Sequence, residues 1–134
     1  MSTAAAELRT TPYELLGGNE AAVRRIVDRF YDLMETAPEA RELRAMHAAD
    51  LGPMRDRLTW FLSGWLGGPA LYAERTGGGV CMSTAHSPFA IDDRARDQWM
   101  WCMRGALAAP DVPAGVREMI EPAFARMTGF LRNR

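Results

Sequence analysis

Apolar positions along the chain recur with helical spacing. Between Asn19 and Met34 they return at intervals of three and four residues, and the same spacing is found from Leu58 to Leu66. The stretches 99–107 and 116–131 show it as well. No segment alternates apolar and polar residues as a half-buried strand does, and no internal repeat is visible. The pattern predicts an all-α domain of about five or six main helices.

Capping residues, glycines and prolines divide this pattern into elements. We expect Asn19 and Asp92 to cap long helices, and the turn around Ser87-Pro88 to end whatever helix precedes it. Residues 70–85 are irregular, with a flexible loop at Gly77–Gly79. The other expected boundaries are a short helical turn at Thr11–Leu16 stopped by Gly17-Gly18, a short helix from Pro38 to Met46 and His47, a helix start at Asp50–Pro53, a stop at Gly67–Pro69, a loop between Pro110 and Pro113, and a kink at Pro122.

Length and composition narrow the class of protein. The 134 residues suit one domain, which we expect at 11–134 behind a loose tail at 1–10. A net charge of −1 gives no electrostatic attraction to nucleic acid or to an anionic membrane. No apolar run is long enough to span a bilayer, and no signal peptide is recognisable. The two cysteines, Cys81 and Cys102, do not form a disulfide framework, so a reducing cytoplasm is expected.

The candidate chemistry centres on one of only two histidines. His86 lies beside a Pro-Phe turn, just before a helix that carries Trp99. A neutral imidazole is well suited to binding haem iron. The four Trp, nine Met and five Phe residues predict a soft apolar interior. These side chains either pack against one another as a core or line a pocket for a planar cofactor. Tyr31, His47 and Trp99 are the polar candidates for such a pocket, although each of them alone is also explained by ordinary packing or capping.

Taken in order, the motifs of the chain resemble those of one family, the group II truncated haemoglobins. The resemblance runs from Thr11 to Asn133 and is most specific in the last of its segments. The matching segments are Thr11–Glu14 with Gly17-Gly18, Phe30–Met34, Met46-His47 with Asp50-Leu51, Arg57-Leu58 with Phe61-Leu62, Gly67–Pro69 with Leu71-Tyr72, and His86 through Met103, which contains His-x-Pro-Phe-x-Ile, Arg-Asp-x-Trp and Cys-Met.

The resemblance implies a shortened globin, in which a two-over-two helical sandwich encloses haem b. His86 would be the proximal iron ligand, and Tyr31, His47 and Trp99 would form a distal hydrogen-bond network. The remaining implied contacts are Leu58 and Phe61 on the distal haem face, Phe30 behind Tyr31, Arg57 at a haem propionate, and Phe89 and Ile91 on the proximal side.

Three departures from the family pattern stand out. Ala85 replaces a basic residue that often precedes the proximal histidine, so one propionate contact is lost. Gly77–Cys81 replaces a common Gly-His-Pro run. Met54 occupies the distal-helix position that faces the ligand, where it would control ligand access by its bulk and leave hydrogen bonding to the other distal residues.

The resemblance leaves several functions open. The leading expectation is a cytoplasmic protein that binds, and in the simplest case transports, dioxygen and other diatomics such as NO and CO. The alternative is a haem redox enzyme that cleaves peroxide or detoxifies nitric oxide with an unidentified reductase, since a polar distal pocket supplies proton donors. A third class is a haem-free helical interaction module. Monomer and homodimer are both compatible with the sequence.

Overall fold

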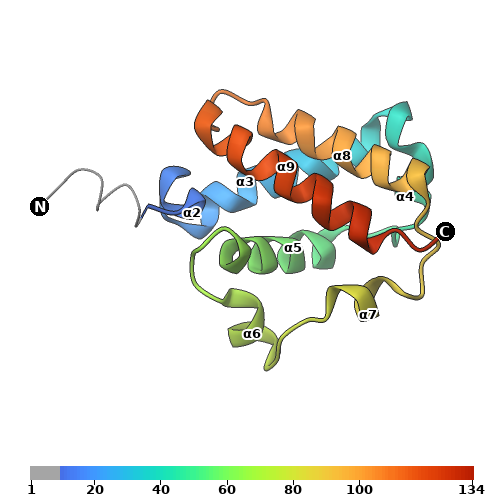
Figure 1. Cartoon of the computed structure of the whole chain (residues 1–134), viewed down its shortest axis with the longest axis horizontal. Coiled ribbons are helices and arrows are strands. Elements are labelled where there is room, and N and C mark those ends of the chain that lie inside the picture. Colours follow the sequence, from blue (N-terminus) through green and yellow to red (C-terminus); the bar gives the residue numbers. More distant parts are fainter. Residues whose placement is uncertain (1–9) are drawn as a thin grey trace, which may run out of the picture.

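The regular structure of the protein is helical throughout the part described, residues 10–134 of a computed structural model (Figure 1). The elements in chain order are α2 (Pro12–Leu15), α3 (Glu20–Thr36), the 3-10 helix η1 (Pro38–Ala40), α4 (Arg41–Ala45), α5 (Gly52–Trp65), α6 (Leu71–Thr76), α7 (Met82–His86), α8 (Asp93–Leu107) and α9 (Ala114–Leu131). The all-α prediction is confirmed. Of the expected tail, residues 1–9 lie outside the described residues.

The two predicted capping residues begin their helices as expected. Asn19 accepts a hydrogen bond at Oδ1 from the Ala22 N–H (2.8 Å), and Asp92 accepts one from the Ala95 N–H (2.8 Å). Each bond satisfies a backbone donor that the first helical turn leaves unpaired. The helix expected from Pro38 is instead divided, because Ala40, at φ −111° and ψ 17°, departs from helical geometry between η1 and α4.

Four long helices form two antiparallel pairs that pack on each other (Figure 1). One pair is α3 with α5 and the other is α8 with α9, while α3 and α8 make the main contact between the pairs. The shorter elements lie around this frame, with α6 against α5 and α7 against α9. The four long helices therefore form the two-over-two sandwich that the sequence predicts.

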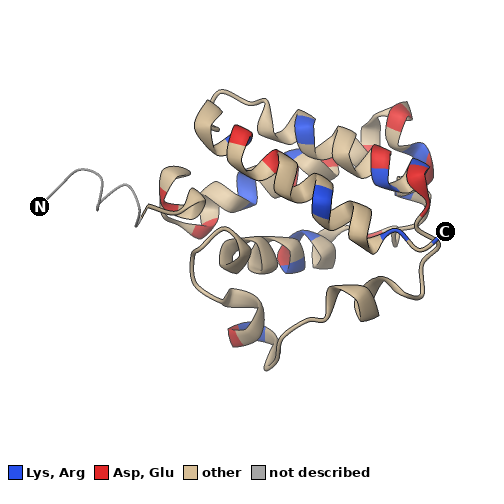
Figure 2. Ribbon diagram, in the orientation of Figure 1, with Lys and Arg blue, Asp and Glu red and all other residues tan. Residues whose placement is uncertain are grey.

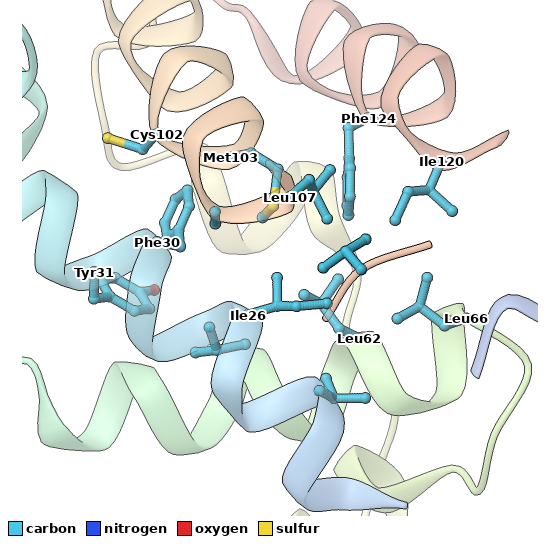
Figure 3. Close-up of a cluster of buried hydrophobic side chains, with 14 of the residues drawn as sticks. Ile26, Phe30, Tyr31, Leu62, Leu66, Cys102, Met103, Leu107, Ile120 and Phe124 are labelled. Atoms are coloured by element: carbon cyan, nitrogen blue, oxygen red, sulfur yellow. The ribbon is translucent and has the colours of Figure 1, made fainter. Parts of the chain in front are cut away.

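The core lies between the two helix pairs (Figure 3). Its largest fully buried side chains include Phe30 and Met34 from α3, Leu62 from α5, Met100, Met103 and Leu107 from α8, and Phe124 from α9. The α3–α8 contact is close at Gly105, where a Cβ would lie 2.6 Å from the Leu33 Cδ1. The Leu33 side chain of α3 therefore packs directly on the backbone of α8 at Gly105.

The turn that ends α5 packs against α2, near the start of the described chain. The Tyr13 N–H donates a hydrogen bond to the Leu66 carbonyl (3.0 Å), which holds α2 against the end of α5. Gly67 follows at φ +96°, and a Cβ at this position would lie 2.6 Å from the Thr11 Cβ. Only glycine meets both requirements, the positive φ and the missing side chain.

The irregular segment 70–91 contains two short helices. The first, α6, ends at Gly77 with φ +81°, and α7 ends at His86, directly before the break expected at Ser87-Pro88. The last helix, α9, continues through Pro122 as one element. Within residues 10–134, no helix combines the length and the apolar character needed to span a membrane.

Candidate haem site

The final residue of α7 presents an imidazole with one nitrogen already engaged. His86 Nδ1 lies 2.7 Å from the carbonyl oxygen of Met82, one turn earlier in the same helix. A carbonyl only accepts hydrogen bonds, so this contact requires the proton on Nδ1 and leaves the lone pair on Nε2. Metal-binding histidines are commonly oriented by such a contact at the second ring nitrogen. The half-exposed His86 therefore has the tautomer of a metal ligand.

The segment that follows His86 is held by Asn133, just beyond α9. The Asn133 Nδ2 donates to the Phe89 carbonyl (2.9 Å), and its Oδ1 accepts from the Ile91 N–H (2.9 Å). The Asn133 backbone N–H also donates to the Ile91 carbonyl (2.8 Å). Asn133 could not be singled out from the sequence, since an asparagine after a helix has many ordinary uses. The structure shows that it fixes the connection between α7 and α8.

The three predicted distal residues come from separate parts of the chain, and two of them, Tyr31 and Trp99, pack against Phe30. Phe30 meets the Tyr31 ring edge-on, with centroids 4.9 Å apart, and lies 5.1 Å from the Trp99 ring. The Tyr31 and His47 rings are 6.1 Å apart. Tyr31 belongs to α3, Trp99 to α8, and His47 to the turn after α4. The structure thus places all three predicted distal residues in one neighbourhood.

The Tyr31 hydroxyl makes no hydrogen bond within residues 10–134. The residue as a whole is only 3% exposed, but its hydroxyl oxygen is not among the fully buried polar atoms that lack a partner, so the hydroxyl remains accessible. Burial raises the pKa of Tyr31, against a smaller lowering by the positive charge of Arg55, so the phenol keeps its proton. The half-buried Trp99 likewise makes no hydrogen bond through its indole N–H in the described part of the chain. The site therefore holds two donors that the protein itself does not use.

The surroundings of His47 lower its pKa and so favour the neutral imidazole. Burial lowers its pKa, the hydrogen bond between Nδ1 and the Leu43 carbonyl (2.9 Å) opposes that shift, and the charges of Arg44 and His86 add to it. At neutral pH, His47 is an uncharged ring with a lone pair on Nε2.

Helix α5 carries a second apolar stripe that the protein covers only in part. Its buried face, packed toward α3, includes the small polar residues Thr59 and Ser63, whose hydroxyls bond to carbonyls one turn earlier. The other stripe is half-buried and consists of Met54, Leu58, Phe61 and Trp65. Apolar side chains in this state favour a further apolar partner.

The remaining predicted contacts are more exposed. The Phe89 side chain is 45% exposed and Ile91 is half-buried, both near His86 along the chain. Arg57 is exposed, and its guanidinium Nη1 lies 3.9 Å from the Met54 Sδ.

The donor set fits haem better than it fits a bare metal ion. Among the described residues, no group of three or more His, Cys, Asp or Glu side chains could hold a metal. A single imidazole suffices only where other ligands come with the metal, as the four pyrrole nitrogens of haem do. The half-buried stripe of α5 supplies the apolar surface that a porphyrin needs, and the unpaired donors of Tyr31 and Trp99 supply the polar end of the site.

Two hollows on the surface do not compete with this site. One, of about 440 Å³, lies against α8 and is lined by Glu39, Arg94, Asp97, Gln98 and Trp101. The other, of about 310 Å³, lies between α8 and α9 beside Arg104, Glu118, Glu121, Pro122 and Ala125. Neither contains a histidine or any of the predicted site residues, and charged side chains line both, so neither suits an apolar planar cofactor.

The two-over-two sandwich and a histidine at the end of a short helix define the protein as a globin of the shortened type. The sequence pattern of the bacterial-like globin family matches residues 11–133, and the chain belongs to that family. Within it, the chain is a group II truncated haemoglobin.

Several relatives support this assignment. The chain is 31% identical over 109 residues to the group 2 truncated hemoglobin YjbI of Bacillus subtilis (strain 168), covering 81% of this chain and 78% of that protein. It resembles the solved cold-adapted truncated hemoglobin of Pseudoalteromonas haloplanktis, with a TM-score of 0.88, 39% identity, and coverage of 93% and 99% of the two chains. For the group II 2-on-2 hemoglobin of Agrobacterium tumefaciens the TM-score is 0.87, with 36% identity and coverage of 92% and 95%.

Proposed function

We propose that this globin binds haem b through His86 and reversibly holds dioxygen and other diatomic ligands, including NO and CO, beside Tyr31, His47 and Trp99. The observation that carries the proposal is the Tyr31 hydroxyl, which makes no hydrogen bond within residues 10–134 and lies in the same neighbourhood as a second donor without a partner there, the indole N–H of Trp99. A related solved structure, 27% identical with a TM-score of 0.81, is described as a truncated oxygen-avid haemoglobin from Bacillus subtilis; it covers 92% of this chain and 100% of that one.

The chain's own residues divide into a holding group and a ligand-binding group. Haem, when bound, supplies an iron that takes one protein ligand and one diatomic ligand. The Nε2 of His86 would hold the iron, and Arg57 would approach a propionate. The apolar contacts would come from Leu58 and Phe61 on the distal side and from Phe89 and Ile91 on the proximal side, with Met54 restricting ligand access.

The distal donors would stabilise the negative charge that dioxygen draws from ferrous iron. The indole N–H of Trp99 only donates, and the protonated phenol of Tyr31 is free to donate. The neutral His47 supplies a lone pair that can orient a neighbouring hydroxyl. Three groups from three elements thus act on one small ligand.

Absorption spectra of the purified protein test the haem assignment directly. We expect a Soret band in the ferric, ferrous and oxygenated forms, and loss of the five-coordinate ferrous spectrum in His86→Ala. Imidazole added to His86→Gly should restore it, because the free ring can occupy the vacated space. A wild-type protein purified with haem supplied that shows no Soret band, or a His86→Ala variant with unchanged spectra, would overturn the proposal.

A redox function is the second candidate, and the lowered pKa of His47 is the observation that favours it. A neutral imidazole close to the ligand site can accept a proton from peroxide, which is the first demand of peroxide cleavage. Peroxide turnover, and NO consumption with a reductase present, would be measured in the wild type and in His47→Phe. Turnover that falls in the variant supports the enzyme, and wild-type inactivity in both assays leaves ligand binding as the function.

The two cysteines bear on where this chemistry takes place. Cys81 and Cys102 are both free thiols, one exposed and one buried. Free exposed thiols are usual in reducing compartments. This supports our placement of the protein in the cytoplasm.

A further inference from the structure

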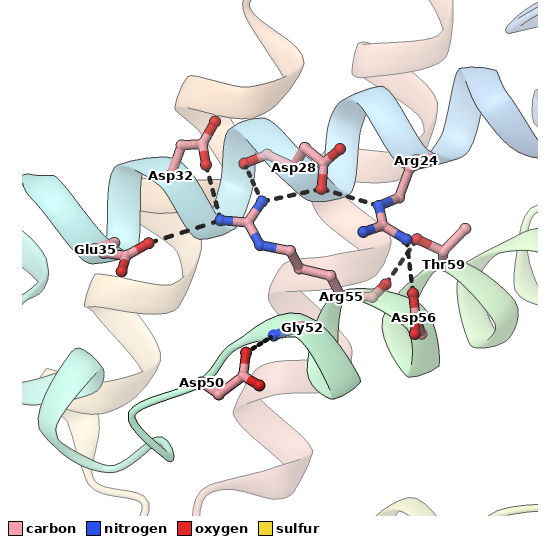
Figure 4. Close-up of polar contacts among 9 residues, drawn as sticks. All are labelled: Arg24, Asp28, Asp32, Glu35, Asp50, Gly52, Arg55, Asp56 and Thr59. Carbon is pink, nitrogen blue, oxygen red and sulfur yellow. Dashed lines mark hydrogen bonds and ion pairs between the residues drawn. The ribbon is translucent and has the colours of Figure 1, made fainter.

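Arg55, on α5, is anchored to α3 by a fork of hydrogen bonds (Figure 4). Its Nη1 donates to the Asp28 carboxylate (2.9 Å) and to the Asp28 carbonyl (3.2 Å), while its Nη2 donates to the Asp32 carboxylate (2.8 Å). The side chain is 16% exposed, in contrast to 66% for Asp32. The guanidinium is therefore largely buried, with its direction fixed by acceptors one helical turn apart.

The same guanidinium covers the ring of Tyr31. The Arg55 Cζ lies 5.7 Å from the centroid of that ring, within the range of a cation–π contact. The other ring neighbours are Phe30, edge-on at 4.9 Å, and His47 at 6.1 Å. Since the Tyr31 hydroxyl makes no hydrogen bond within residues 10–134, its direction depends on how the ring is packed, and Arg55 is the charged group in that packing.

We propose that Arg55 is a positioning residue for Tyr31, whose ring it holds from α5 so that the hydroxyl is aimed at the ligand. This inference rests on the proposed function of Tyr31 as a donor to the bound ligand. Three properties of arginine suit the task. Its charge is permanent, its planar fork is fixed by two carboxylates at once, and it has no acceptor that would compete for the phenol proton.

The same network contains a matched control. Arg24 also bridges the two helices, with Nε on the Asp28 carboxylate (2.9 Å) and Nη1 on the Asp56 carboxylate (2.8 Å) (Figure 4). Within residues 10–134, the cation–π contact to the Tyr31 ring comes from Arg55 and not from Arg24. Arg24→Met and Arg55→Met each remove ion pairs between α3 and α5. Only Arg55→Met removes the group that covers the phenol.

The experiment compares these variants as haem-loaded proteins. For Arg55→Met we expect dioxygen release to accelerate about fivefold, the factor that corresponds to one neutral hydrogen bond. We also expect the C–O stretching frequency of the CO complex to rise and the Tyr31 ring to flip faster by NMR. Arg24→Met should change release by less than about twofold, since exposed ion pairs contribute little. Equal effects in the two variants would overturn the proposal.

A double-mutant cycle separates positioning from a direct effect of charge. If Arg55 acts through Tyr31, Arg55→Met should have no further effect on dioxygen release or on the CO stretch in a Tyr31→Phe background. An undiminished effect there would overturn the inference while leaving the proposed function intact. A Tyr31→Phe variant that releases dioxygen like the wild type would instead overturn the role of Tyr31 as a donor.

Arg55→Lys guards against a variant that fails to fold. Lysine keeps the positive charge beside the ring but cannot bond to both carboxylates in one plane. We expect a folded protein with an intermediate release rate and an intermediate CO stretch. A release rate and ring-flip rate equal to the wild type in Arg55→Lys would show that the anchored fork is not needed, and would overturn the positioning role.

Discussion

Asn133 and Ile91 exchange two hydrogen bonds across the end of the molecule, one through the Asn133 side chain (2.9 Å) and one through its backbone N–H (2.8 Å). Together with the bond from the Asn133 Nδ2 to the Phe89 carbonyl, they fasten the chain after α9 to the segment that follows His86. A residue remote in sequence thereby restrains the proximal side of the proposed haem site.

Replacing Asn133 should therefore loosen haem more than it destabilises the fold. Asn133→Ala loses two side-chain hydrogen bonds and should lower the free energy of unfolding by about 1 kcal/mol. Haem transfer to an excess of apomyoglobin would measure its release, which we expect to be several-fold faster. Asn19→Ala is the matched control, because Asn19 also accepts one hydrogen bond and donates one, at the start of α3. Equal haem release from both variants would contradict the prediction.

The pH dependence of dioxygen release should originate at His47. Burial lowers its pKa, so the folded protein protonates His47 only below the ordinary imidazole range. Nδ1 is bonded to the Leu43 carbonyl, and the incoming proton therefore goes to Nε2, which changes from an acceptor to a charged donor. A charged donor holds the ligand more strongly, so release should be constant at neutral and higher pH and should slow as the pH falls below about 6.5.

Stopped-flow measurements across this pH range would check the assignment to His47. Of the groups around it, Arg44 stays charged throughout, and Tyr31 stays protonated because burial raises its pKa. His47→Phe should therefore flatten the profile, and a profile that keeps its wild-type shape would refute the assignment.

Trp99→Phe should speed ligand release with little change in stability. The aromatic packing of Trp99 against Phe30 and Phe124 would largely persist, while the indole N–H is lost. One neutral hydrogen bond corresponds to about 1 kcal/mol, or about fivefold in the release rate of dioxygen. Trp101→Phe is the control, because Trp101 lies on the same helix but is 39% exposed. A comparable acceleration in both variants would count against a donor role for Trp99.

Gly67→Ala should destabilise the fold more than Gly77→Ala. Both glycines have positive φ, +96° and +81°, and a left-handed backbone costs alanine about 1 kcal/mol or more. Only at Gly67 would the new Cβ also collide, 2.6 Å from the Thr11 Cβ, whereas nothing lies within 4 Å at Gly77. The difference between the urea unfolding midpoints of the two variants measures the cost of the collision at Gly67. Equal midpoints would show that α2 moves away from the new Cβ without a measurable loss of stability.

The helices could be predicted from the sequence because their signals are local. Asn19 and Asp92 cap the helices that they were expected to cap, since a side chain bonding three residues ahead needs no tertiary partner. The break after His86 likewise follows from Pro88 alone. The division of the helix after Pro38 could not be predicted, because no local signal marks the change of backbone geometry at Ala40.

The tertiary partners of the site could not be predicted in this way. Asp28 and Asp32 lie one turn apart on α3, and such a pair of carboxylates favours a basic partner. Two arginines of α5, Arg55 and Arg57, lie close together in sequence, and the sequence does not distinguish between them. Only the packing of α5 on α3 turns Arg55 inward and leaves Arg57 exposed. Asn133 is a similar case, because its bonds to Phe89 and Ile91 join positions more than forty residues apart.

The half-buried stripe of Met54, Leu58, Phe61 and Trp65 has a consequence for the life of the protein in a cell. On the proposed function, this surface is shielded only after the cofactor arrives. Newly made chains would then be open to chaperones, to proteases and to one another for as long as haem is scarce. The amount of this globin that accumulates would then depend on the supply of porphyrin and iron as well as on transcription of its gene.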